Sequence, residues 1–380
     1  MENEKAPMQL PLLANAVLVL IGLIAFFYIL DIGAGILIPL VFSFVFSLFL
    51  YPFCRKLEKY KIPRTFAILA CLLLVIVVLS LVFWIIYENV LSFSADLPKM
   101  QESGQELVTS LQKFIEKTFQ LSSEGQIEWL RQNLRSFVNT GGQLLNGAIN
   151  TTTTFLAQLF LIPVYTFFIL LYRHVFKGFL NRVFDVEHHE KMGHILGQVE
   201  TVIQKYIVGL ITVVSIIAVL NIIGLISIGI RHAVFFGVLA AFLTIIPYIG
   251  IFIGSLLPIL YALAMTDSLF YPLAVLIWFQ IVQVLEGNVI TPNIVGSQVS
   301  INPLVAMLAL LIGGSLWGIA GMIIFVPLTA MLKVILDNIP ILAPYGFLLS
   351  EGETKVSKFK IKPVLMFRNL FFWKRKRSRK

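Results

Sequence analysis

Long stretches without a charged side chain dominate this sequence and limit what it can fold into. They cover residues 6–30, 32–54, 65–87, 136–172, 206–230, 233–266, 268–285 and 287–332. A helix needs about 20 consecutive apolar residues to cross a bilayer, and these stretches reach or approach that length. Charged residues supply only 13% of the chain, whereas soluble domains use about 25%. The sequence therefore predicts an all-α polytopic membrane protein.

Two of the stretches do not fit a single crossing. As straight helices, 233–266 and 303–332 would be about 51 and about 45 Å long, against a hydrocarbon core of about 30 Å. Each is interrupted near its middle, by Pro247 in the first and by Gly318 in the second. Two interpretations stay open for each: a long tilted or kinked helix with a close-packing face, or a re-entrant hairpin. The expected fold has six to eight membrane segments, either eight spans or six spans plus two re-entrant hairpins.

Simple spans are expected for the other stretches, at about 11–30, 33–53, 65–87, 153–172, 207–230 and 268–285. Lys and Arg in short loops set the orientation of such spans. The loop 54–64 contains five basic residues and one acid, so it is predicted to be cytoplasmic. Counting spans from this loop places both termini inside the cell, a turn at Asp31 outside, and residues 88–150 outside.

This topology divides the chain into four parts. Residues 1–87 form N-terminal membrane spans, 88–152 an extracytoplasmic helical segment, 153–345 the main transport membrane domain with broken helices, and 346–380 a basic cytoplasmic tail. Amphipathic stretches in the second part must bury their apolar faces, either within the protomer or as a subunit contact or lid.

The basic charge of the chain belongs to its tail. The formal net charge is +9, but residues 355–380 carry eleven Lys and Arg and no acid. A nucleic-acid partner is therefore not expected. Basic residues interleaved with aromatic ones favour binding to anionic lipid on the cytoplasmic leaflet, although a solvated tail that only enforces topology is the alternative. The proposed membrane-surface residues are Lys374, Arg375, Lys376 and Arg377.

Glu286 is the ionisable residue that stands out among the apolar stretches. Gln280, Gln283 and Glu286 recur every three residues, so on a helix they form one slanted polar stripe. An ionisable group at membrane depth suggests an ion or substrate pathway; the alternative is a helix end at the wet cytoplasmic interface. The remaining candidates for this pathway are Asn288, Thr291 and Pro292.

Proline and glycine residues at the breaks have two possible roles. They can kink or closely pack helices whose neighbours satisfy the freed carbonyls, or they can act as hinges that expose backbone groups to a solute. The candidate residues are Pro247, Gly250, Gly254, Pro258, Gly296, Pro303, Gly313, Gly314, Gly318, Gly321 and Pro327.

Other chemistry is weakly represented. No G-x-x-x-x-G-K-[ST] sequence exists to bind ATP, and nothing suggests an enzyme or a cofactor. His188, His189 and His194 with their acidic neighbours are more typical of a solvated helix face than of a metal site, and all five histidines are expected in polar loops. Residues at the ends of the stretches are expected to mark boundaries or anchor the topology; they are Asp31, Asp267, Asp337, Arg64 and Arg173.

Several motifs in a fixed order resemble the autoinducer-2 exporter (AI-2E) family. They include Tyr206-Ile-Val-Gly209, Ile246-Pro-Tyr-Ile-Gly250, Gln283 to Gly296, Gly318-Ile-Ala-Gly321, Val326-Pro327-Leu328, Ile62-Pro-Arg64 and Pro163 to Arg173. The resemblance covers nearly the whole chain. One departure is Leu210, where the family usually has Gln after the glycine.

The resemblance implies a multi-pass transporter of the bacterial cytoplasmic membrane that needs no ATP. Members are linked to export of a quorum-sensing signal or to cation–proton antiport, and the family implies a homo-oligomer, a pentamer. We therefore expect a secondary transporter, an exporter or ion-coupled antiporter, of a small polar solute, a monovalent cation or a proton. Its site is expected between the two broken segments and the span 268–285. A passive channel and a non-transporting membrane scaffold are the alternatives.

Overall fold

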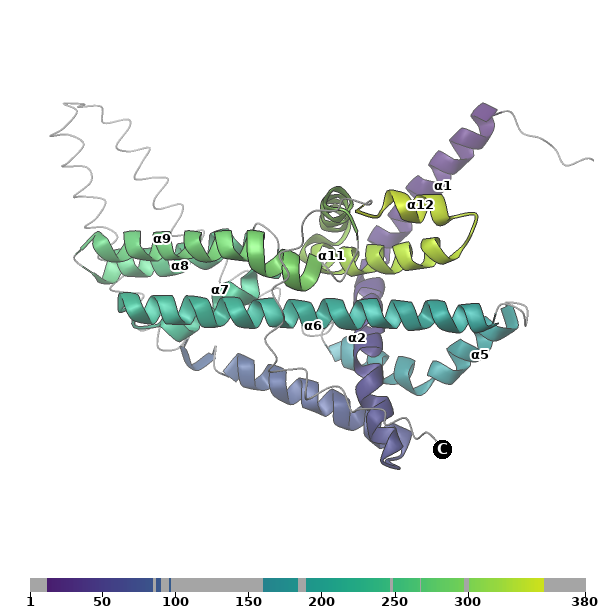
Figure 1. The fold of residues 1–380 in the computed structure, drawn as a ribbon, viewed down its shortest axis with the longest axis horizontal. Helices are drawn as coiled ribbons and strands as arrows, with labels where there is room; N and C mark the ends of the chain where they lie inside the picture. The colour runs from purple at the N-terminus through teal and green to yellow at the C-terminus, as the bar shows by residue number, and fades with distance from the viewer. Residues whose placement is uncertain are drawn as a thin grey trace, which may run out of the picture.

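The computed structural model describes residues 12–84, 87–89, 96, 160–183, 189–246, 249–266, 268–296 and 301–351. Every element in these ranges is helical (Figure 1), which confirms the all-α class. Within them, five helices are long and apolar enough to cross a membrane: Ala34–Lys59, Arg64–Asn89, Glu190–Ile228, Phe270–Gly296 and Pro303–Asn338. A sixth is present if Phe160–Leu171 and Arg173–Val183, which meet at 58°, form one bent span. The protein is therefore a polytopic membrane protein.

The first two helices do not form a hairpin. α1 (Leu12–Ile32) and α2 (Ala34–Lys59) are separated only by Gly33. The Gly33 N–H donates to Ile29 O and the Leu37 N–H donates to Gly33 O, both at 2.9 Å, so helical bonding continues through the junction. Figure 1 shows the two helices running end to end with a bend. The predicted reversal at Asp31 is wrong, because no loop is present to turn the chain, and the side on which the amino terminus lies does not follow from the loop 54–64.

α6 (His189–Ile228) organises the rest of the molecule. At 40 residues it is longer than the span expected at 207–230, because the polar stretch before it continues the same helix. Buried residues recur along it at helical spacing: Ile195, Val199, Ile203, Val213, Ile217 and Leu225. The first three pack with α2 and α11, and the others pack with α7, α8 and α9.

The stretch 233–266 is a helical hairpin. Its arms are α7 (Ala233–Leu243) and α8 (Ile249–Met265). A Cβ atom on Gly250 would lie 1.6 Å from Leu243 O, and one on Gly254 would lie 2.9 Å from Ala240 Cα, so the antiparallel arms touch through their backbones. They are about 17 and about 26 Å long, each shorter than a hydrocarbon core of about 30 Å. One long helix is therefore excluded here, and Pro247 lies outside the described residues.

The second long stretch lies in α11 (Pro303–Asn338), which is broken at its middle. Trp317 (φ −125°, ψ 18°) and Gly318 (φ 56°, ψ −135°) leave the helical region, and the Gly318 conformation is open only to glycine. Beyond the break, Gly321 packs so closely that a Cβ atom on it would lie 1.8 Å from Gly313 O. The chain therefore folds back sharply at Gly318. α11 leads into the short α12 (Ala343–Leu348).

The remaining helices complete the bundle. α5 (Arg173–Val183) follows the bend after the helix Phe160–Leu171. That helix packs with α2 and with the helix 64–84 around buried Cys54 and Ile68, and the Ser43 hydroxyl donates to Ile162 O at 2.9 Å.

Candidate functional site

Glu286 begins an unusual section of helix. α9 (Phe270–Leu285) passes directly into two π-helical turns, η2 (Glu286–Ile290) and η3 (Pro292–Gly296). Pro292 has no N–H to offer to the preceding turn, which helps to explain why regular α-helical bonding stops here. π-Helical turns widen a helix and occur frequently at functional sites.

Two neighbouring side chains donate hydrogen bonds to the Glu286 carboxylate, one to each oxygen. Gln283 Nε2 donates to Glu286 Oε2 at 3.2 Å, and Thr291 Oγ1 donates to Glu286 Oε1 at 2.6 Å. Thr291 is five residues after Glu286, a separation that a π-turn places on one face. Glu286 is half-buried, and no ion pair in the described part of the chain involves it. The result is an oriented carboxylate whose charge no neighbouring cation neutralises.

The other residues of the predicted pathway lie differently. Gln280 is exposed one turn before Gln283. Asn288 Nδ2 donates a hydrogen bond to the Val284 carbonyl at 2.9 Å. Its side chain therefore bonds to the backbone of its own helix instead of contacting the Glu286 carboxylate. Pro292 is exposed at the start of η3.

The π-helical segment contacts α6 at Gly209. A Cβ atom on Gly209 would lie 3.2 Å from Ile294 O, so the missing side chain lets η3 approach closely. On one side of Gly209, the buried residues around Ile203 pack α6 against α11. On the other side, Ile222 of α6 contacts Gly237 of α7, and Gly224 of α6 contacts Trp278 of α9. The segment that follows Glu286 therefore packs on α6 between its contacts with the two broken elements.

The candidate hinge prolines are mostly packing residues. Pro258 in α8 and Pro327 in α11 are fully buried within their helices, which favours the kink interpretation at these two positions. Pro303 is the first residue of α11, after an N-cap in which the Val305 N–H donates to Asn302 Oδ1 at 2.8 Å. Gly296 ends η3, and Gly314 faces the Met322 side chain.

A polar hollow that the sequence analysis missed lies between α6 and the last turns of α11. Its volume is about 750 Å³. Two glycines of α6 face it without close neighbours, so their missing side chains keep it open. It is lined by Gly193, His194, Gly197, Gln198, Thr201, Val202, Lys333, Val334, Asp337 and Asn338.

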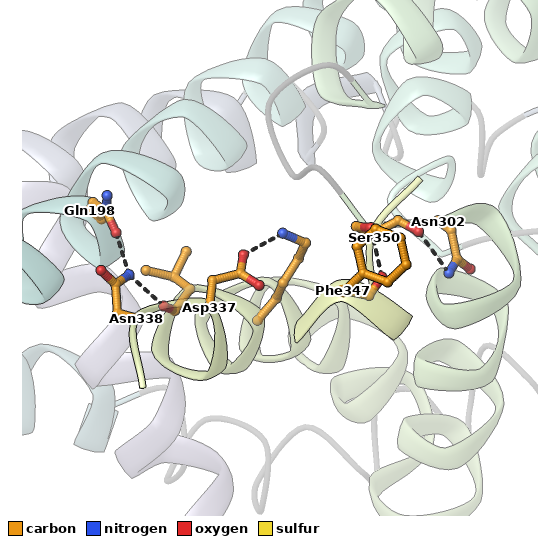
Figure 2. Close-up of polar contacts among 8 residues, drawn as sticks. Gln198, Asn302, Asp337, Asn338, Phe347 and Ser350 are labelled. Carbon is orange, nitrogen blue, oxygen red and sulfur yellow. Dashed lines mark hydrogen bonds and ion pairs between the residues drawn. The ribbon is translucent and has the colours of Figure 1, made fainter. Parts of the chain in front are cut away.

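Hydrogen bonds join the two walls of this hollow (Figure 2). Asn338 Nδ2 donates to Gln198 Oε1 at 2.7 Å, and Gln198 Nε2 lies 2.9 Å from His194 Nε2. Lys333 Nζ pairs with Asp337 Oδ2 at 2.5 Å. The lining therefore offers amide, imidazole and charged groups with no excess of either charge. Asp337 was expected only as a boundary residue, and no local pattern connects it with residues of α6 about 140 positions earlier.

Figure 2 also shows how α12 returns to the start of α11. Asn302 Nδ2 donates to Leu348 O at 3.0 Å and to Ser350 O at 3.2 Å. Gly346 of α12 lies against Asp337, whose Oδ1 would be 2.1 Å from a Cβ atom there. α12 thus closes a loop that fixes the two ends of α11 relative to each other.

A second missed cluster is buried beside the α7–α8 hairpin. His232 Nε2 lies 2.9 Å from Asp96 Oδ2, and the Tyr261 hydroxyl donates to the same oxygen at 3.2 Å. All three side chains are buried. His232 lies in the turn before α7, but its ring is buried and not exposed in a polar loop. The prediction that every histidine lies in a loop is wrong for His174, His189 and His194, because the polar stretches that contain them continue as helices α5 and α6. The hydrogen bond from His232 is the main cause that lowers the pKa of Asp96.

Two sets of predicted residues cannot be placed. Lys374, Arg375, Lys376 and Arg377 lie outside the described residues, as do His188, Pro247 and Asp267. Within the described ranges, no three His, Cys, Asp or Glu residues are grouped in a way that could hold a metal ion.

The protein combines long apolar helices and two broken elements with an oriented carboxylate, and this combination is typical of membrane transport proteins. The model of the AI-2E family transporters matches residues 17–341. The chain belongs to the AI-2E transporter family, as its motifs indicate.

Individual relatives match along most of the chain. It is 28% identical to YrrI of Bacillus subtilis (strain 168) over 345 residues, which cover 87% of this chain and 96% of YrrI. It is 25% identical over 309 residues to TqsA of Escherichia coli (strain K12), which is named as an AI-2 transport protein; these residues cover 80% of this chain and 87% of TqsA.

Proposed function

We propose that this chain is a secondary transporter, an exporter or ion-coupled antiporter, of a small polar solute or a monovalent cation, with Glu286 in the transport pathway. The observation that carries the proposal is the Glu286 carboxylate, which Gln283 and Thr291 orient on a π-helical section of an apolar helix. A carboxylate in that setting can bind a proton, a cation or the cationic group of a solute.

The two broken elements support the same function. Discontinuous helices that free backbone groups near the middle of the membrane form the substrate sites of many secondary transporters. Here α7–α8 and α11 both pack on α6, with η3 between them. We propose that both are re-entrant and that the polar hollow between α6 and α11 is the cytoplasmic entrance to the pathway.

The cellular setting is part of the proposal. Five basic residues in loop 54–64 favour a cytoplasmic position for that loop. From the resemblance to the family, we propose that the chain lies in the bacterial cytoplasmic membrane and forms a homo-oligomer, a pentamer. TqsA is named for AI-2 transport, so AI-2 is the first solute to test, followed by protons and monovalent cations.

The test is flux into proteoliposomes as a function of pH, for wild type and Glu286→Gln. The amide keeps the shape of the side chain and removes its charge, so we expect coupled flux to fall at least tenfold while expression and assembly are unchanged. Glu190→Gln, which alters an exposed acid in the first turn of α6, is the matched control and should behave as wild type.

Two outcomes would contradict the proposal. Identical rates and pH profiles for Glu286→Gln and wild type would remove Glu286 from the pathway. Unitary conductance in planar bilayers, without saturation by solute, would identify a passive channel instead of a transporter.

A further inference from the structure

We propose that Arg64 and Arg173 form a binding site for the phosphate of an anionic phospholipid. Arg64 follows Pro63 at the start of the helix 64–84, and Arg173 begins α5 at the bend after Tyr172. The two residues are far apart in sequence. From their positions in the sequence they are expected only to anchor the topology. The proposed lipid site does not depend on the transport activity.

Fixed contacts bring the two guanidinium groups to one place. Arg173 Nη2 forms an ion pair with Glu58 of α2, and the Arg173 guanidinium lies 5.0 Å from the centre of the Tyr51 ring. Arg64 Nη1 lies 3.0 Å from His174 Nδ1. Since the Arg64 guanidinium is always a donor, His174 Nδ1 is the acceptor of this hydrogen bond.

The charges at this place do not balance. Arg173 repels the charge of Arg64, and Glu58 attracts it, so all three groups interact. Two cations face one carboxylate, which leaves one positive charge. A further anion would stabilise two like charges that are held together.

Hydrogen-bonding groups are also left over. Among the described residues, Arg64 Nε, Arg173 Nη1 and Glu58 Oε1 are buried without a partner. A buried donor without an acceptor is costly, so such a group favours the binding of a hydrogen-bond acceptor beside it. Glu58 Oε1 has two lone pairs and can accept from both arginines, but the single negative charge of Glu58 faces two positive charges, so one positive charge remains.

A phosphate group supplies what is missing. Its oxygens accept parallel hydrogen bonds from guanidinium groups, and the free N–H groups in the first turn of the helix 64–84 add a favourable dipole.

The surroundings favour a lipid over free phosphate. Large aromatic side chains around the two arginines are exposed, at Tyr60, Phe66, Phe168 and Tyr172. Exposed Tyr and other aromatic residues beside Lys and Arg mark the level of the headgroups in a membrane. Basic pockets between transmembrane helices on the cytoplasmic side are suited to anionic headgroups. Apolar surface next to the arginines can then contact the glycerol and acyl chains.

The experiment measures the melting temperature of the purified full-length protein in a neutral detergent during titration with phosphatidylglycerol, phosphatidylcholine or inorganic phosphate. We expect phosphatidylglycerol to raise the melting temperature of wild type in a saturable manner. In Arg64→Gln the half-saturating concentration should rise at least tenfold. Lys59→Gln, which removes an exposed charge at the end of α2, should match wild type.

Arg64→Lys is the second variant, in case Arg64→Gln does not fold. It keeps the charge but loses the forked donors, so it should also bind phosphatidylglycerol more weakly than wild type does. Equal half-saturation in wild type and both Arg64 variants would overturn the proposal, and so would equal stabilisation by phosphatidylcholine. The same shift with inorganic phosphate at the same concentration would identify a free-phosphate site and refute the lipid assignment.

Discussion

Thr291 reaches the Glu286 carboxylate because the helix is wide at this point. In an α-helix, residues three and four apart share a face, and a hydroxyl five positions on would point away from the carboxylate. The two π-helical turns remove that limit. Glu286 is therefore oriented by neighbours on its own segment, and a change in the π-turns would alter its position directly.

Thr291→Val tests this arrangement, because valine keeps the branched shape of threonine and removes the donor to Glu286 Oε1. We expect a several-fold slower flux, and a loss of stability of about 1 kcal/mol, the contribution of a typical hydrogen bond. Proteoliposome flux and the melting temperature are the measurements. Thr212→Val is the control, since the exposed Thr212 hydroxyl donates only to Val208 O at 2.7 Å among the described contacts. Flux at the wild-type rate in Thr291→Val would show that this hydrogen bond does not orient a transport group.

At the scale of elements, backbone-to-backbone packing explains why the two long stretches do not cross as single helices. Gly250 and Gly254 let α8 lie directly against α7, and Gly313 and Gly321 do the same on the two sides of the break in α11. A side chain at any of these positions would separate the arms. The glycines therefore function mainly in close packing, and Gly318 alone among them requires a positive φ.

The proposed re-entrant course of α7–α8 is tested by single cysteines at Arg231 and Ser268, exposed residues that flank the hairpin. The buried Cys54 and Cys71 are first replaced by alanine. Because arms of about 17 and about 26 Å are shorter than the hydrocarbon core, we expect a membrane-impermeant maleimide to label both positions from the same side of oriented vesicles. Labelling from opposite sides would show that the segment between them crosses the membrane.

At the scale of the whole molecule, α6 joins parts that would otherwise lie apart (Figure 1). One end of α6 packs against α2 and α11, and the other end packs against α7, α8 and α9. Asp96 adds a connection from the segment 88–152 to the turn after α6 and to α8 through His232 and Tyr261. The amphipathic stretches of that segment, whose packing was left open between the protomer and a subunit contact, lie outside the described residues; Asp96 contacts His232 and Tyr261 of the same protomer.

Asp96→Asn should weaken this connection, because the amide keeps the shape but loses the negative charge that His232 and Tyr261 contact. A carboxyl whose pKa is lowered by folding stabilises the protein above its ordinary pKa of 3.8, and the contribution is lost as the pH falls further. We therefore expect Asp96→Asn to lower the melting temperature at pH 7, and the difference from wild type to shrink below about pH 3.8.

Asp31→Asn, which changes an exposed carboxyl of α1, should leave the melting temperature unchanged and serves as the control. A difference between Asp96→Asn and wild type that grows as the pH falls below 3.8 would contradict the assigned direction of the pKa shift.

Local properties of the sequence were sufficient for the fold class and for the polar stripe. Apolar length is a property of consecutive residues, so it identified a polytopic helical protein and the two stretches too long to cross once. Gln283, Glu286 and Thr291 lie within nine residues of each other, so their contact is local, although the π-helical turns that bring Thr291 to Glu286 were not predicted.

Contacts between distant residues were decided by the tertiary structure. Gln198 with Asn338, His232 with Asp96, and Arg64 with His174 are each separated by more than 100 positions, and no spacing along the chain predicts which of them meet. The bend at Gly33 was also decided by contacts between distant residues. Glycine permits either a turn or a continuous helix, and the packing of α2 and α11 selects the helix. Burial and pairing depend on how α6 gathers its neighbours, so the polar hollow, the buried Asp96 and the excess charge at Arg64 and Arg173 exist only once the helices are packed.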